Sequence, residues 1–144
     1  MGSDIKNIGI GFATGRKNFR RVARTYAENW YESGIASDEN IRLHLYVAYD
    51  LKYKNTKPKD YRNLDQRILD MLEFPLFIGD NTIKQEANAL VNAGIISEYE
   101  AELLFGEGYG KKRNAIMFFA IKNKMDYLLY IDDDEYPVAA IDTS

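Results

Sequence analysis

The sequence contains no cysteine, which excludes disulfide bonds and thiol chemistry. It has a single histidine, His44, which has no histidine partner for a metal site. No apolar run reaches membrane-spanning length, and the N-terminus lacks the pattern of a secretory leader. Basic residues number 19 against 22 acidic ones, so a formal charge of −3 gives no reason to expect a nucleic-acid partner. These absences predict a cytoplasmic protein without a transmembrane segment.

Hydrophobic residues make up 46% of the chain and charged residues 28%, which is typical of a folded globular protein. A length of 144 residues allows one domain with a substantial core. Residues 1–144 are therefore predicted to form a single domain.

Short apolar runs alternate with helical patterns. Strand-like runs occupy residues 5–13, 41–49, 74–80 and 127–131, and the last is expected to be buried. Helices are predicted at about 18–34, 64–72, 81–94, 97–105 and 111–124, the last with a buried stretch at 115–121. Residues 51–63 are rich in lysine and are interpreted as a solvated loop. The alternation predicts a Rossmann-like α/β domain with a mostly parallel sheet in strand order 3-2-1-4 and helices on both faces.

Polar residues follow every predicted strand. In such sheets ligands bind at the carboxyl ends of the strands, where this sequence places residues 14–17, Asp50, Asp80 and an acidic run. That run begins at Asp132 within "YLLYIDDDEYP". Side chains two apart in an extended chain point the same way, so Asp132 and Asp134 converge if the strand geometry continues. Two converging carboxylates suit Mg²⁺ or Mn²⁺, and the alternative interpretation is a solvated acidic turn.

Two stretches carry a family resemblance. An apolar strand ending in Asp-x-Asp, preceded by a glycine-containing loop and an Arg-Asn pair, occurs in "GKKRNAIMFFAIKNKMDYLLYIDDDE". The opening "IGIGFATGRKNFRRVARTYAENW" supplies a strand, a turn and an amphipathic helix. Together they resemble the first half of the nucleotide-sugar glycosyltransferases of the GT-A fold, in particular the family-2-like enzymes. The segment "VAYDLKYKN" departs from this pattern, because it lacks the Asp-Gly-Ser run often found after the second strand.

The resemblance implies a glycosyltransferase that binds a nucleotide diphosphate sugar through a divalent cation, Mn²⁺ or Mg²⁺, and transfers the sugar to an unknown sugar, lipid or protein acceptor. Asp132 and Asp134 are the implied metal ligands. The implied donor-binding residues are Thr14, Arg16, Asp50, Arg113, Asp132 and Asp133. No catalytic base is identified. The acceptor half of such enzymes follows the Asp-x-Asp strand, so we expect the chain to be truncated before that half, and to be inactive as a fragment if transfer requires both halves.

Three other interpretations stay open. An Asp-based phosphotransferase would normally have Thr or Val where this chain has Tyr136. A dinucleotide-binding domain is suggested by Gly9, Gly11 and Gly15, but they are spaced as GxGxxxG and the first two lie inside the first predicted strand rather than in the turn. The third interpretation is a non-catalytic module that binds a nucleotide or a metal.

Overall fold

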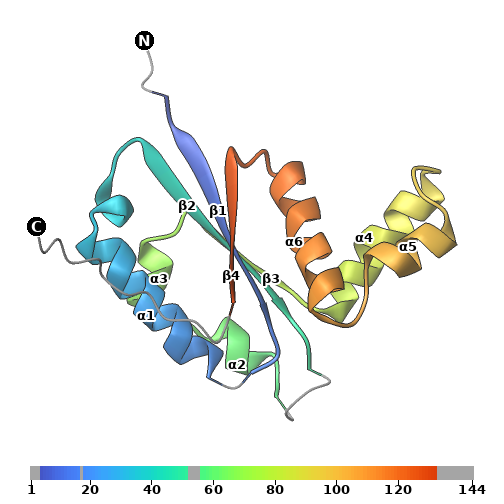
Figure 1. Ribbon diagram of the computed structural model, residues 1–144, viewed down its shortest axis with the longest axis horizontal. Helices are drawn as coiled ribbons and strands as arrows, with labels where there is room; N and C mark the ends of the chain where they lie inside the picture. The colour runs from blue at the N-terminus through green and yellow to red at the C-terminus, as the bar shows by residue number, and fades with distance from the viewer. Residues whose placement is uncertain (1–3, 17, 52–55, 133–144) are drawn as a thin grey trace, which may run out of the picture.

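A four-stranded sheet, all of it parallel, forms the centre of the protein in the computed structural model, which describes residues 4–16, 18–51 and 56–132. The strands are β1 (Lys6–Thr14), β2 (Ile41–Tyr49), β3 (Phe74–Ile78) and β4 (Tyr127–Asp132). Their order in the sheet is β3-β2-β1-β4, so the predicted order is confirmed. The carboxyl ends of all the strands therefore point to the same edge (Figure 1).

The helices lie on both faces of this sheet, as predicted (Figure 1). They are α1 (Phe19–Glu32), α2 (Lys59–Arg62), α3 (Gln66–Asp70), α4 (Asp80–Asn92), α5 (Glu98–Leu104) and α6 (Tyr109–Lys122), with a short 3₁₀ turn at Ile35–Ser37. Within the described residues no helix is long and apolar enough to cross a membrane.

Alternation along β2 explains the two cores. Leu45 and Val47 point toward α1 and join a cluster with Phe19 and Val22. The alternate side chains, Tyr46 and Ala48, point to α6 and its buried residues. A strand apolar on both faces is what a parallel sheet covered on both sides requires.

Two glycines of β1 let the neighbouring elements approach the strand closely. A Cβ at Gly11 would lie 2.7 Å from Cγ2 of Ile116 on α6. A Cβ at Gly9 would crowd the Tyr46, Leu128 and Met125 side chains at 3.1–3.2 Å. These glycines serve helix and sheet packing, so their spacing gives no support to the dinucleotide-binding interpretation.

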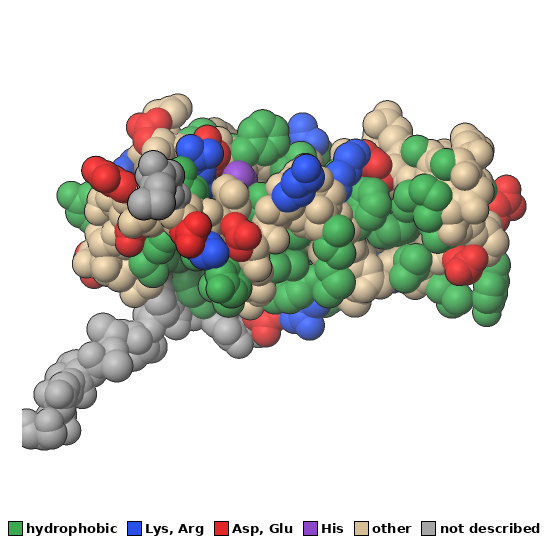
Figure 2. Space-filling model, turned by 90° about the horizontal axis from the view of Figure 1, so that it is seen from above, with side chains coloured by type: hydrophobic (Ala, Val, Ile, Leu, Met, Phe, Trp, Pro, Cys, Tyr) green, Lys and Arg blue, Asp and Glu red, His purple; other side chains and the backbone are tan. Residues whose placement is uncertain are grey.

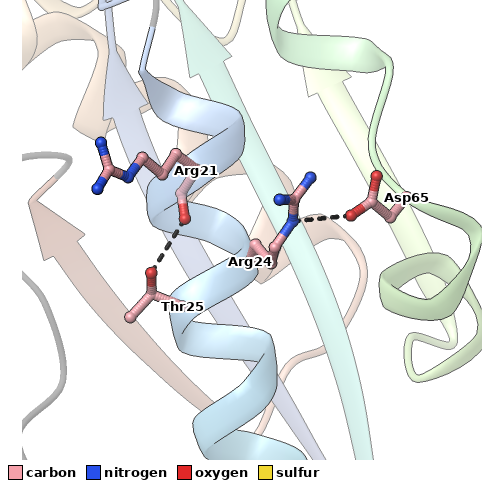
Figure 3. A network of polar contacts seen from close by, with 4 residues as sticks. All are labelled: Arg21, Arg24, Thr25 and Asp65. Carbon is pink, nitrogen blue, oxygen red and sulfur yellow. Dashed lines mark hydrogen bonds and ion pairs between the residues drawn. The ribbon is translucent and has the colours of Figure 1, made fainter.

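Helix α1 buries most of the apolar stripe that its periodicity predicts, although Tyr31 at its end is 60% exposed. Its polar face contacts the start of α3. Arg24 Nε donates to Asp65 Oδ2 over 2.9 Å, while Thr25 Oγ1 donates to the carbonyl oxygen of Arg21 over 3.0 Å (Figure 3). The Arg24–Asp65 pair is half exposed on both sides, so it orients the α3 segment more than it stabilises the fold.

The prediction that residues 51–63 form a solvated loop is wrong in part, because most of the described residues are exposed but a short helix and a buried tyrosine interrupt them. Residues 59–62 form α2, and the Tyr61 side chain is fully buried. Its ring stacks on that of Tyr49, with centroids 5.1 Å apart, and its hydroxyl donates to Thr56 Oγ1. Tyr61 is therefore buried by its contacts with Tyr49 and Thr56, although the neighbouring residues in the sequence include several lysines.

The prediction of a buried fourth strand is also wrong, because β4 is at the edge of the described sheet. Tyr127 and Leu129 are 59% and 56% exposed. On the neighbouring helix α6, Met117 and Ile121 face outward too, so the 115–121 stretch is only partly buried.

Candidate functional site

The carboxyl ends of β1 and β2 bring Thr14 and Asp50 together. The Asp50 amide donates to the Thr14 carbonyl oxygen over 2.9 Å, continuing the parallel ladder one step past the strands. Both side chains are buried, Thr14 completely and Asp50 to 3% exposure. The Arg16 amide contacts Thr14 Oγ1 at 3.4 Å, which holds the turn after β1 against this edge.

Asp50 is tied to the beginning of α6. The Gly108 amide donates to Asp50 Oδ2 at 3.4 Å, between residues that are 58 positions apart in the chain. Gly108 has φ of 94°, a left-handed conformation that glycine adopts without a Cβ penalty. The glycine-rich loop before α6 is thereby folded over the end of β2.

Arg113 and Asp132 form an ion pair at the end of β4, with Nη2 and Oδ1 2.5 Å apart. Asp132 also pairs in register with Ala13, directly before Thr14. Tyr130 donates its hydroxyl to the Arg113 carbonyl oxygen over 2.8 Å, which fixes this turn of α6 against β4. Burial raises the pKa of Tyr130, and the Arg113 charge partly opposes that shift.

A third contact of α6, between Lys112 and Asp80, was missed from the sequence. Lys112 Nζ lies 2.7 Å from Asp80 Oδ1, and the lysine side chain is fully buried while that of Asp80 is 53% exposed. The signal was present: Lys112 is three, four and seven positions before Ala115, Ile116 and Phe119, all of which are buried. The N-cap and first turns of α6 thus contact Asp50 after β2, Asp80 after β3 and Asp132 at the end of β4.

A pocket of about 400 Å³ opens beside these contacts, between the ends of β2 and β3. Its lining includes Tyr49, Arg62 and residues 79–82 at the start of α4. Arg62 Nη2 donates to the Tyr49 hydroxyl over 3.0 Å. Tyr49 and Leu51 in the lining flank Asp50, so the pocket adjoins the candidate site, although the sequence did not single out its residues.

The structure therefore brings Thr14, Arg16 and Asp50 together at one edge and joins Asp132 to Arg113 at the same edge. Asp133 and Asp134 lie outside the described residues, so their predicted roles stay predictions. Within the described ranges, no group of three or more metal-ligating side chains is gathered. The half-exposed Asp132 carboxylate fits one position of a Mg²⁺ or Mn²⁺ site, since these ions often take one or two protein carboxylates.

His44, by contrast, is a structural residue. It is half buried in β2, and its Nε2 lies 3.0 Å from Asn7 Oδ1. Burial lowers its pKa, an effect opposed by Glu73 and reinforced by Arg42.

Comparison with known proteins finds no family model, no curated protein and no solved structure that matches this chain.

Proposed function

We propose that this protein binds a nucleotide diphosphate sugar at the carboxyl edge of its sheet, with the help of a divalent cation, and transfers the sugar to an acceptor. The observation that supports this most is that Thr14, Asp50 and Asp132 lie at one edge of the sheet, next to the start of α6. Arg113 on α6 brings a guanidinium group to the same edge. Ligands of open parallel α/β sheets bind at this edge.

Arg113 has the chemistry to hold a diphosphate. A guanidinium forms bidentate hydrogen bonds with phosphate oxygens, and these are stronger when both groups are charged. In the free protein its partner is Asp132, and the two side chains are 47% and 49% exposed. A pair this exposed is worth only about 0–1 kcal/mol, so a phosphate can replace the carboxylate at little cost.

Asp132 gains a new role when Arg113 turns to a phosphate. Its carboxylate becomes available as a hard oxygen ligand at the end of β4, next to Ala13 and Thr14. A bound divalent cation supplies Lewis-acid stabilisation of a leaving diphosphate. Asp134 is proposed to share that cation, by the alternation of an extended chain.

Asp50 is proposed to face the nucleotide base, as the family resemblance implies. Its carboxylate accepts from the Gly108 amide, so its position is set by the loop before α6. The pocket beside Tyr49 and Leu51 adjoins this position.

Isothermal titration with UDP, GDP and ADP, each with and without Mn²⁺, tests the binding. We expect at least one diphosphate to bind in a Mn²⁺-dependent manner, and the matching nucleoside to bind more weakly. Incubation with the corresponding nucleotide sugar then separates an enzyme from a non-catalytic nucleotide-binding module: release of nucleoside diphosphate supports the enzyme. If none of the diphosphates bound with Mn²⁺ present, the proposal would be wrong.

A further inference from the structure

Helices α4 and α5 form a pair that extends beyond the sheet (Figure 1). The sequence predicts an inward apolar stripe on α4, and the structure buries only Ile83 of that stripe, to 5% exposure. Ala87, Leu90 and Val91 are half buried. Among the described residues nothing covers this stripe completely, although its spacing is that of a helix face packed against a partner.

A groove of about 400 Å³ runs between the two helices. Ala87 and Val91 line it from α4, and Ala101 and Phe105 line it from α5 and its end. Figure 2 shows apolar side chains exposed at the end of the molecule that these helices form. They belong to a set of exposed apolar residues on this helix pair that includes Ile95, Tyr99 and Leu103, which are 67%, 70% and 56% exposed. An apolar groove with apolar flanks is typical of a protein interaction site.

The charge on the groove is negative. Helix α5 has the sequence EYEAELL, with three glutamates and no basic residue. Its charge of −3 equals the formal charge of the whole chain. Glu98 and Glu102, one helical turn apart, both line the groove, and Lys84 is the one basic residue of its described lining. Lys111 borders the Phe105 end, where its Nζ donates to the Glu102 carbonyl oxygen over 2.6 Å, so the acidic side chains dominate the Glu98 end. An anionic lipid surface and the α5 helix of a second copy would both be repelled by these carboxylates.

We propose that the groove between α4 and α5 binds an amphipathic helix with a basic polar face. Apolar side chains at helical spacing on the partner enter the groove over Ala87, Val91 and Ala101. Lysine or arginine side chains flanking that stripe meet Glu98 and Glu102. This is the helix-in-groove mode of recognition, in which apolar anchors supply affinity and flanking charges select the partner.

A fluorescein-labelled peptide of about 15 residues, with leucines at helical spacing and lysines elsewhere, serves as the probe. Fluorescence anisotropy with the whole chain is expected to show saturable binding. A peptide of the same composition with its leucines distributed around the helix is expected to bind at least about tenfold more weakly, a difference of about 1.4 kcal/mol. A leucine–glutamate peptide of the same pattern is expected not to bind.

The double variant Glu98→Gln, Glu102→Gln is expected to weaken binding about three- to tenfold, in line with the loss of two rim charges. Its matched control is Glu28→Gln, Glu32→Gln, which changes the net charge equally on exposed positions of α1 and should bind like wild type. Val91→Thr, nearly identical in shape, should weaken binding by making the floor polar. Circular dichroism confirms that each variant is folded.

Three outcomes would overturn the proposal. They are equal binding of the patterned and redistributed peptides, equal effects of the two glutamate pairs, and no binding at all. Sedimentation of the free protein adds a fourth test, because self-association lost in the Glu98, Glu102 and Val91 variants would assign the groove to a second copy instead.

Discussion

Arg113 and Asp132 form an ion pair across the carboxyl edge of the sheet, although 19 positions separate them in the chain. This pair joins the residue proposed to bind phosphate to the residue proposed to bind the cation. Arg113→Ala is expected to weaken binding of a nucleoside diphosphate about tenfold or more, because a charge-assisted hydrogen bond contributes about 1.5–3 kcal/mol. Binding of the nucleoside should change little, because Arg113 has no proposed contact with it.

Titration calorimetry with both ligands measures the two effects. Arg113→Lys is the matched control: it keeps the charge but loses the bidentate geometry, so an intermediate loss is expected. Equal losses for diphosphate and nucleoside would refute the phosphate role of Arg113.

Lys112 and Asp80 are unequal partners, because the lysine is fully buried while the aspartate is half exposed. Asp80→Asn leaves a buried ammonium group without its carboxylate, and we expect a loss of about 3 kcal/mol in the free energy of unfolding. Lys112→Met fills the same space with an apolar chain and leaves Asp80 in contact with water. Its expected cost is below about 1.5 kcal/mol. Urea unfolding of both variants measures the difference, and the opposite order of stability would contradict this account of the pair.

Gly79 is in contact with the Tyr49 hydroxyl at the rim of the pocket. A Cβ at position 79 would lie 2.6 Å from Tyr49 Oη and 3.0 Å from its Cζ. Gly79→Ala is therefore expected to cost about 1–3 kcal/mol through overpacking. Tyr49→Phe removes the closer atom, so the alanine should cost about 1 kcal/mol less in that background. A double-mutant cycle by thermal or urea unfolding tests the coupling; strictly additive effects would show that the contact is absent.

His44 makes stability depend on pH. Burial holds its pKa in the folded protein below the usual 6.5, so the unfolded chain binds more protons between these two values. Stability is therefore retained above the unfolded pKa and lost as pH falls from there through the folded pKa. Urea unfolding from about pH 8 to about pH 5 should show a smaller decrease for His44→Gln than for the wild type. The same slope in both proteins would contradict the assigned cause.

The sequence predicts the sheet well because each strand is marked by a local pattern of apolar residues. Each strand is a short apolar run, β1, β2 and β3 are each followed by a helix, and short parallel crossovers leave few possible orders. The same reasoning placed Thr14, Asp50 and Asp132 at one edge, since the carboxyl ends of parallel strands coincide.

Burial that depends on distant partners was predicted less well. Lys112 belongs to a Lys-Lys-Arg run that looks solvated, and its partner Asp80 is 32 positions away. The apolar pattern of residues 127–131 is equally compatible with a central strand and with the edge position that β4 occupies. Tyr61 stands among lysines and polar residues in the sequence, yet its side chain belongs to the hydrophobic core, where its ring stacks on that of Tyr49.

The most direct test of the proposed site is the melting temperature in the presence of Mn²⁺ and the nucleoside diphosphate. If Asp132 and Asp134 share a cation with the diphosphate, the two ligands together should raise the melting temperature more than the sum of their separate effects. Asp132→Asn and Asp134→Asn should abolish this joint increase, whereas Asp133→Asn should retain most of it. If all three variants kept the joint increase, or if all three lost the same part of it, the acidic run would be a solvated turn.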